Sequence, residues 1–274
     1  MKRFIYILAS VLLIISSCTE KIDIELNDDK NSRLVIDGGI TTDTTVHTIR
    51  LTRTTSYFKN EPAPKETGAT VTITGGNMSY ILTETSPGVY QTDAGAFGKF
   101  GETYTLNVTL KNGEKYDASA IIDTVALIDA VVYYYHPYWE EYVLLLYAQE
   151  PEGEGDNYYF NIYMDGKLDN DTLRETSFES DELIDGMYVP GLEFYWIDKT
   201  KITNDLTHIK VDMLSMSNEQ YDYYLALMSE TDWRGGPFDG PPANIPSNIS
   251  NGGLGFFWAS GIASYELDII KEHE

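Results

Sequence analysis

The chain has 274 residues, and its 43 Asp and Glu residues outnumber its 19 Lys and Arg residues, so its formal net charge is −24. Such an acidic chain repels phosphate backbones and its sequence shows no basic patch, so we expect no nucleic-acid partner. Its 21 Tyr and 10 Phe residues argue against a disordered protein. The length suits two domains of ordinary size.

The first 17 residues are typical of a secretory signal peptide. Lys2 and Arg3 form a charged start, and residues 4–15 form an apolar run. A helix needs about 20 apolar residues to cross a bilayer, so this run is too short to span one. We therefore expect residues 1–17 to be removed from the mature protein.

Cys18 is the single cysteine of the chain, so it has no partner for an intrachain disulfide. The order Ile-Ser-Ser-Cys at residues 15–18 resembles the bacterial lipobox, whose cysteine receives a diacylglyceryl group. We predict lipid attachment at Cys18, with an intermolecular disulfide or a free thiol as the alternatives. The polar residues 18–31 then form a tether. Residues 19–23 resemble in part a surface-export signal of Bacteroidota lipoproteins.

Short segments rich in Val, Ile, Thr and Tyr begin at residue 32, and several alternate polar and apolar residues as half-buried strands do. The expected strands are 33–40, 46–54, 69–75, 79–84, 88–92, 102–110 and 114–122. Asn112-Gly113 between the last two predicts a hairpin with a type I′ turn. Short strands at this spacing with no helix between them predict a β-sandwich domain, immunoglobulin-like or transthyretin-like, over residues 32–122.

A second β-rich domain is expected over residues 124–274. Its strand-like segments are 126–136, 141–149, 157–166, 192–198, 207–215, 254–260 and 263–270. The period changes at 217–230, where Tyr221, Tyr224, Leu225 and Met228 mark one face of a helix. Ser217 with Gln220 fits a capping box at its start. The fold class is therefore all-β with one helix, a sandwich followed by a second antiparallel sandwich-type domain.

Residues 231–253 are rich in Pro and Gly and show no period. Loops this long are usually functional or disordered, and Trp233, Phe238, Ile245 and Ile249 argue against full disorder. Two interpretations stay open. The segment contacts a partner or covers a ligand through Trp233 and Phe238, or it is a strap that packs its apolar residues across the second sandwich.

The acidic run at residues 150–155 resembles part of a calcium loop. Glu150, Glu152 and Glu154 take positions 1, 3 and 5, but position 12 is Asn161 and the flanks are strand-like, so it is not an EF-hand. The favoured interpretation is an acidic hairpin loop between the strands on either side. The alternative is weak calcium binding by Glu152, Glu154 and Asp156.

Residues 133–142 hold the densest aromatic cluster. Tyr133, Tyr135, Tyr138 and Trp139 are candidate contacts for a ligand or partner, because exposed rings stack on sugars and other flat ligands. In the alternative interpretation, Tyr133 and Tyr135 face the core. The four His residues lack ligand spacing and there is no second cysteine, so we expect no firm metal site and no cofactor.

Catalytic motifs are missing from the sequence: there is no G-x-S-x-G, no P-loop and no G-x-G-x-x-G after a strand. Carboxylate pairs are frequent in so acidic a chain, so a glycosidase pair has no specific location. We therefore expect a protein that is not an enzyme, with a surface hydrolase as the less favoured alternative.

Several motifs in order resemble an uncharacterised lipoprotein family of Bacteroidota, catalogued as a domain of unknown function. They are the lipobox, KIDIEL (21–26), RLVIDGGIT (33–41), VHTIRLTRT (46–54), EPEGEGDNYY (150–159), Pro241-Pro242, Asn248-Ile249 and GGLGFF (252–257). The family is similar in placement to surface lipoproteins that accompany TonB-dependent outer-membrane receptors. The resemblance implies a lipid-anchored, surface-exposed outer-membrane protein that serves such a receptor in nutrient capture, with a structural or adhesive surface protein as the alternative. It implies no catalytic residues.

Overall fold

The structure is a computed structural model, and it describes residues 32–55, 61–232 and 244–272. The chain divides into one unit of residues Met1–Ser32 and a compact unit of residues Arg33–Glu274. The second unit contains the sheets described below. Within the described residues, no helix is both long and apolar enough to cross a membrane.

The first region is one sheet of eight strands in the order β15-β1-β2-β5-β4-β3-β6-β7. Its strands are β1 (Leu34–Thr41), β2 (Thr48–Arg53), β3 (Thr70–Gly75), β4 (Met78–Ser86), β5 (Val89–Gln91), β6 (Thr103–Thr109), β7 (Lys115–Ile121) and β15 (Leu254–Ser260). Alternate residues of these strands are buried in one core, as Tyr104, Leu106 and Val108 of β6 show. The seven strands predicted over this region are confirmed, as is the all-β sandwich class.

Strand β15 was predicted with the second region, but it pairs in parallel with β1 of the first sheet. Phe257 and Ala259 of β15 are buried in the first core, which is why the strand belongs there. Parallel neighbours need a long crossover connection, and here that connection includes β2–β14 and α2. The predicted domain boundary near residue 123 stays a prediction. β15 lies after that boundary in the sequence, although it pairs within the first sheet.

The hairpin predicted at Asn112-Gly113 is present, but its type I′ turn is wrong. A type I′ turn needs positive φ at both central residues, and here Gly113 has φ 89° while Asn112 does not lie in the left-handed region. Gly113 N donates to Leu110 O, as in a type I turn followed by a left-handed glycine. Leu110 N also reaches Glu114 O, so the loop holds one more residue than a type I′ hairpin.

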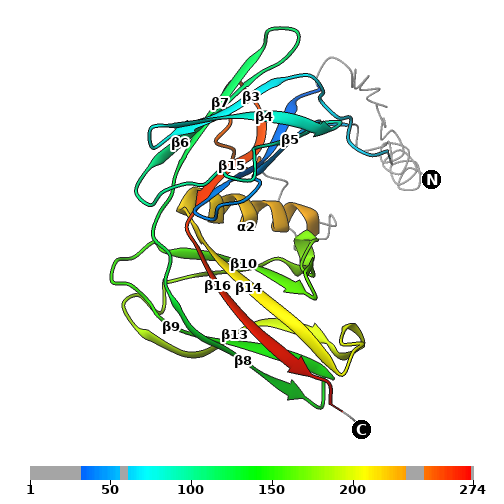
Figure 1. Ribbon diagram of the computed structural model, residues 1–274, viewed down its shortest axis with the longest axis vertical. Coiled ribbons are helices and arrows are strands. Elements are labelled where there is room, and N and C mark those ends of the chain that lie inside the picture. Colours follow the sequence, from blue (N-terminus) through cyan, green and yellow to red (C-terminus); the bar gives the residue numbers. More distant parts are fainter. Residues whose placement is uncertain (1–31, 56–60, 233–243, 273–274) are drawn as a thin grey trace, which may run out of the picture. The chain divides into compact units, whose positions relative to one another are not determined.

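The second region packs two sheets around its own core (Figure 1). Its elements are β8 (Ile128–His136), β9 (Glu141–Gln149), β10 (Asn157–Met164), β11 (Lys167–Leu168), the 3-10 helix η2 (Leu173–Glu175), β12 (Ser177–Ser180), β13 (Tyr188–Asp198), the 3-10 helix η3 (Lys199–Lys201), β14 (Leu206–Met216), α2 (Asn218–Asp232) and β16 (Ile262–Ile270). One sheet has the order β11-β10-β14-β16 with β12 on β10, and the other has the order β13-β9-β8. The predicted strands are confirmed, while the short β11 and β12 were not predicted.

The predicted helix is confirmed as α2, and the Ser217 half of the predicted capping box is present at its start. Ser217 Oγ accepts a hydrogen bond from Gln220 N at 3.2 Å, which satisfies one of the free N–H groups at the helix start. The helix contacts both regions, because Tyr224 packs on Tyr159 of β10 and Tyr223 packs on Phe256 of β15, each with ring centroids 5.3 Å apart. Leu225 was predicted on the packed face, yet it is 43% exposed.

Candidate functional site

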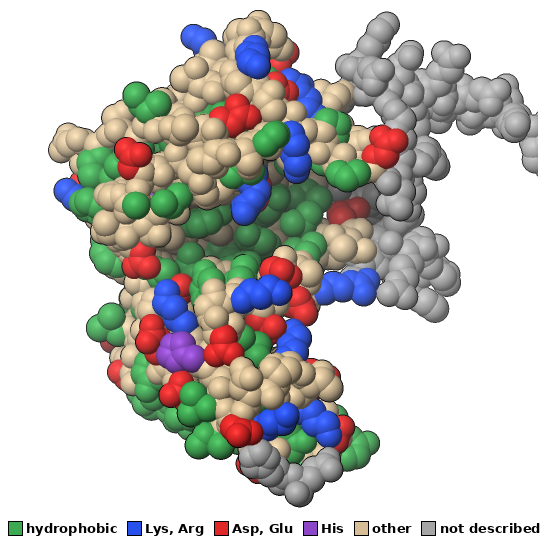
Figure 2. Space-filling model, turned by 45° about the vertical axis from the view of Figure 1, so that its right-hand side comes forward, with side chains coloured by type: hydrophobic (Ala, Val, Ile, Leu, Met, Phe, Trp, Pro, Cys, Tyr) green, Lys and Arg blue, Asp and Glu red, His purple; other side chains and the backbone are tan. Residues whose placement is uncertain are grey.

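A cleft of about 410 Å³ lies where β1, β2 and β15 of the first sheet face β10, β14 and α2. Small-ligand sites in proteins usually measure about 300–1,000 Å³, so its size is suitable for a small molecule. Figure 2 shows a hollow with hydrophobic side chains inside it and Lys, Arg, Asp and Glu side chains around it. The cleft combines aromatic and polar groups from both regions of the chain, and it is the candidate binding site.

Strand alternation explains why these side chains reach the cleft. On β10, Tyr159, Asn161 and Tyr163 line the cleft, while Phe160 and Ile162 between them are fully buried in the second core. Successive residues of a strand point to opposite faces. The same sequence pattern that builds the core therefore presents a polar and aromatic face to the cleft.

Trp258 of β15 lines the cleft, and its indole ring fits there because its register partner on β1 is a glycine. Gly39 and Trp258 are register partners. A Cβ atom added to Gly39 would lie 2.1 Å from the backbone oxygen of Trp258 and 2.3 Å from Cδ2 of its indole ring. Only a residue without a side chain lets the ring lie against β1 in this way.

Charged groups in the cleft form two pairs of unequal strength. Lys210 Nζ lies 2.9 Å from the buried carboxylate of Asp212, and Ser264 Oγ donates to the same carboxylate at 2.6 Å. Arg50 Nη1 and Asp37 Oδ2 are 3.8 Å apart, with side chains 60% and 53% exposed. Asp212 is therefore committed to protein partners, while Asp37 and Arg50 are available to a ligand.

The carboxylate of Asp37 lies close to a group of tyrosines. Loss of surrounding solvent raises the pKa of Asp37, and nearby Arg50 opposes that shift. Burial raises the pKa of Tyr223 to about 12, and the negative charge of Asp37 adds to this effect. The pKa values of Tyr159 and Tyr224 are raised mainly by burial, and again Asp37 contributes. These phenols stay protonated at neutral pH and keep their hydrogen-bond donors.

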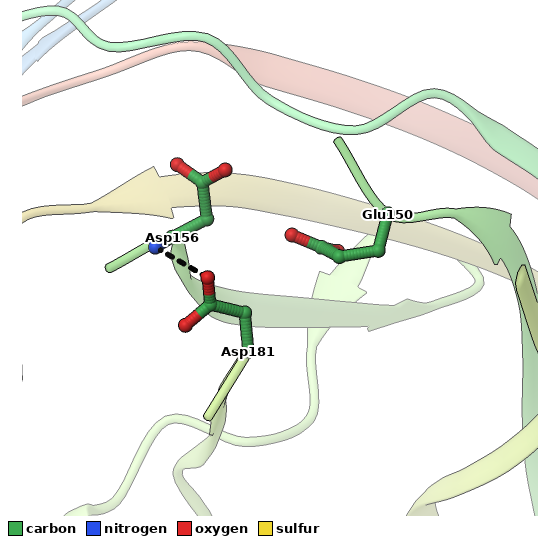
Figure 3. A group of neighbouring side chains, drawn as sticks. All are labelled: Glu150, Asp156 and Asp181. Carbon is green, nitrogen blue, oxygen red and sulfur yellow. Dashed lines mark hydrogen bonds between the residues drawn. The ribbon is translucent and has the colours of Figure 1, made fainter. Parts of the chain in front are cut away.

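A second candidate site is a group of three carboxylates from Glu150, Asp156 and Asp181, with one oxygen of each within 4.8 Å of the others (Figure 3). Asp181 accepts hydrogen bonds from the backbone N–H groups of Gly155 at 2.9 Å and Asp156 at 3.1 Å. Tyr158 Oη donates to Glu150 Oε1 at 2.8 Å. We call this group the carboxylate cluster.

The pKa of Glu150 is raised from its ordinary 4.5 to about 7, mainly by burial. The hydrogen bond from Tyr158 opposes this shift, and the charges of Asp156, Asp181 and Asp185 add to it. Burial and neighbouring carboxylates also raise the pKa of Asp156. Carboxylate oxygens are the ligands that calcium prefers, so the cluster could hold a hard cation. It could equally share protons among its members.

The calcium alternative named Glu152, Glu154 and Asp156, and the structure brings only Asp156 into the cluster. Glu152 and Glu154 are exposed and lie outside it. Asp181 was missed, because it lies in an acidic stretch with no local signal that pairs it with residue 156. Calcium binding stays a prediction, which calorimetric titration of the wild type against a Glu150→Gln variant tests.

The favoured interpretation of residues 150–156 as a hairpin loop is wrong. Strand β9 pairs with β8 and β13, whereas β10 pairs with β11, β12 and β14, so the loop crosses between sheets. Asp181 holds it there through the backbone of Gly155 and Asp156, and Asp181 N donates to Asp156 O. Gly153 and Gly155 have φ values of 131° and 113°, so the loop does use its glycines in turns.

The aromatic candidates of residues 133–142 do not form one site. Tyr133 and Tyr135 pack on Tyr142, with ring centroids 6.1 and 5.1 Å apart, on the core side of β8. Tyr138 and Trp139 occupy the turn between β8 and β9 and are 84% and 59% exposed. The first pair follows the core interpretation, and only the second pair is free to contact a ligand or partner.

The remaining candidates, Cys18, Trp233 and Phe238, lie outside the described residues. The described part of the long loop, residues 244–253, packs on the first sheet, because Ile249 is buried in the first core. Ser250 N donates to Asp117 O of β7 at 2.8 Å. For this part, the alternative interpretation as a strap across the second sandwich is wrong.

Comparisons with known proteins place the chain in a family without assigning an activity. A comparison with curated proteins gives no match. The solved structure titled "Central Fibronectin-III array of RIM-binding protein" has 15% sequence identity and a TM-score of 0.20, over 68% of this chain and 58% of that chain. Residues 19–266 match the family described as "Domain of unknown function (DUF4249)", and the chain therefore belongs to that family.

Proposed function

We propose that the protein is a non-catalytic binding protein, held at the surface of the outer membrane by a lipid on Cys18, that captures a small polar ligand for a TonB-dependent receptor. The observation that carries the binding role is the cleft between the first sheet and the second region, with its aromatic and polar lining. The anchor and the receptor rest on the sequence around Cys18 and on the resemblance to Bacteroidota lipoproteins.

The chemistry of the cleft supports binding more than catalysis. Asp212 is held by Lys210 and Ser264, which keeps it from acting as a free acid or base. His47 is buried, and its Nε2 lies 3.2 Å from Ala96 O. Burial lowers the pKa of His47, so the ring is neutral at physiological pH. These groups are held by protein contacts, and Asp37 is left to face a ligand.

The first test of the proposed function is purification of the protein from the outer membrane of its host in mild detergent. We expect a TonB-dependent receptor to co-purify in a stoichiometric amount. A palmitate analogue should label the wild type, and Cys18→Ala should lose both the label and the membrane fraction. Purification without a receptor would refute the accessory role, and an unchanged label in Cys18→Ala would refute the anchor.

A further inference from the structure

We infer that the cleft takes a neutral saccharide as its ligand, an inference that rests on the proposed binding function. The first argument is the balance of charge. Lys210 is paired with Asp212, and Arg50 lies 3.8 Å from Asp37, so the cations of the lining are matched by carboxylates. Asp43 is exposed and adds a further negative charge. An anionic ligand therefore meets no net positive charge here.

The second argument is a pair of amides without partners. Gln220 is only 5% exposed and Asn161 is half-buried, and both line the cleft. Among the described residues, neither side-chain amide has a hydrogen-bond partner. Neither amide group is among the buried atoms that lack a partner, so both are reached by water or by a ligand in the cleft. Gln220 also borders a neighbouring hollow of about 350 Å³, so Asn161 is the more specific reporter of the cleft.

The chemistry of an amide matches the hydroxyl groups of a sugar. A side-chain amide offers both donors and acceptors, and a sugar hydroxyl needs both. Asp37 adds acceptors and Arg50 adds donors from the opposite wall. Two neutral amides and one ion pair without net charge therefore favour a ligand with many hydroxyl groups and no net charge.

The aromatic lining supplies the third argument. Trp258 lies over Gly39, so one side of its indole ring rests on the backbone of β1. Tyr163, Tyr159 and Tyr224 line the cleft from β10 and α2. Rings of this kind offer an apolar face with a polar tip. The apolar C–H face of a sugar ring packs on such a surface while its hydroxyl groups reach the amides.

The test is isothermal titration calorimetry of the full mature protein with a panel of neutral mono- and disaccharides, namely glucose, galactose, mannose, N-acetylglucosamine, maltose, cellobiose and lactose. We expect at least one to bind. Asn161→Leu removes the amide at nearly constant volume and should weaken that binding roughly 10-fold, the value of about one well-formed hydrogen bond. Trp258→Ala should weaken it by at least as much.

Trp139→Ala is the matched control, because it removes an exposed aromatic ring outside the cleft and should leave binding unchanged. Circular dichroism confirms that each variant is folded, and Asn161→Leu keeps the test valid if Trp258→Ala does not fold. The saccharide inference would be overturned if no neutral sugar gave a heat of binding, or if glucosamine or glucuronate bound more tightly than the neutral sugars. It would also be overturned if Trp139→Ala weakened sugar binding as much as the cleft variants do. Receptor co-purification is read without ligand, so it distinguishes this failure from failure of the proposed function.

Discussion

The cleft and the carboxylate cluster both bring together polar groups from distant parts of the chain. In the cleft opposite charges are paired, whereas in the cluster three acidic groups lie together. In the cleft, Lys210 and Asp212 pair, and the amides of Asn161 and Gln220 have no hydrogen-bond partner within the described part of the chain. In the cluster, Glu150, Asp156 and Asp181 bring like charges together. The difference indicates a cleft suited to a neutral ligand and a cluster that responds to protons or cations.

The largest expected effect concerns Glu150, whose pKa is raised from 4.5 to about 7 by burial. Between these values the folded state holds a proton that the unfolded state has released, so the free energy of unfolding falls as pH rises through this window. The expected contribution is about 3 kcal/mol at most. Glu150→Gln stays neutral, so urea unfolding should show it more stable than the wild type at pH 8 and similar at pH 4.5. Glu152→Gln, exposed and outside the cluster, is the control, and identical pH profiles for Glu150→Gln and the wild type would contradict the account.

The next effect concerns the cleft wall. Gly39→Ala places a Cβ atom 2.1 Å from the backbone oxygen of Trp258, so β1 and β15 must separate. We expect a loss of about 2 kcal/mol in thermal or urea unfolding, as in overpacked cores. Gly95→Ala is the matched control, because no atom lies within 4 Å of the added Cβ. Equal stability of the two variants would show that the indole does not rest on Gly39.

A smaller effect is expected for Asp181→Ala. The change leaves the N–H groups of Gly155 and Asp156 without their acceptor, which destabilises the fold. It also removes a charge beside Glu150, which offsets part of that cost. We expect a net loss of about 1 kcal/mol at pH 7 in urea unfolding. Asp181→Asn removes the same charge but keeps an acceptor, so it should lose less; an alanine variant more stable than the wild type would show that charge repulsion dominates.

The smallest effect is expected for Arg50→Ala. Exposed ion pairs contribute about 0–1 kcal/mol, and in this pair the charged atoms are 3.8 Å apart and both side chains are more than half exposed. The free energy of unfolding should change by less than about 0.5 kcal/mol. A loss above 2 kcal/mol would mean that Arg50 and Asp37 form a structural pair rather than groups available to a ligand.

Local features of this fold were predictable and long-range ones were not. Alternation identified the strands of both regions, and the period over residues 217–230 identified α2. Such patterns report which face of an element is apolar. They do not report which element covers that face, so the partner of β15 and the crossing of residues 150–156 between sheets were missed.

The candidate site followed the same rule. Tyr133 and Tyr135 lie in the densest aromatic cluster of the sequence, yet strand alternation places their side chains against the second core. Gly39 and Trp258 form the cleft wall although 218 other residues separate them in the sequence, and neither has a local signal. In the sequence, Asn161 looks like any other strand residue. Only the fold places its side-chain amide in the cleft, without a hydrogen-bond partner among the residues that the structure describes. A cleft between distant strands leaves no motif in a single sequence.

The most direct test of the central claim is a crystal structure of the protein with the neutral saccharide that binds most tightly. The account predicts a sugar ring in the cleft, packed on Trp258 and hydrogen-bonded to the side-chain amide of Asn161. A sugar bound instead at Tyr138 and Trp139, with the cleft occupied only by water, would contradict it.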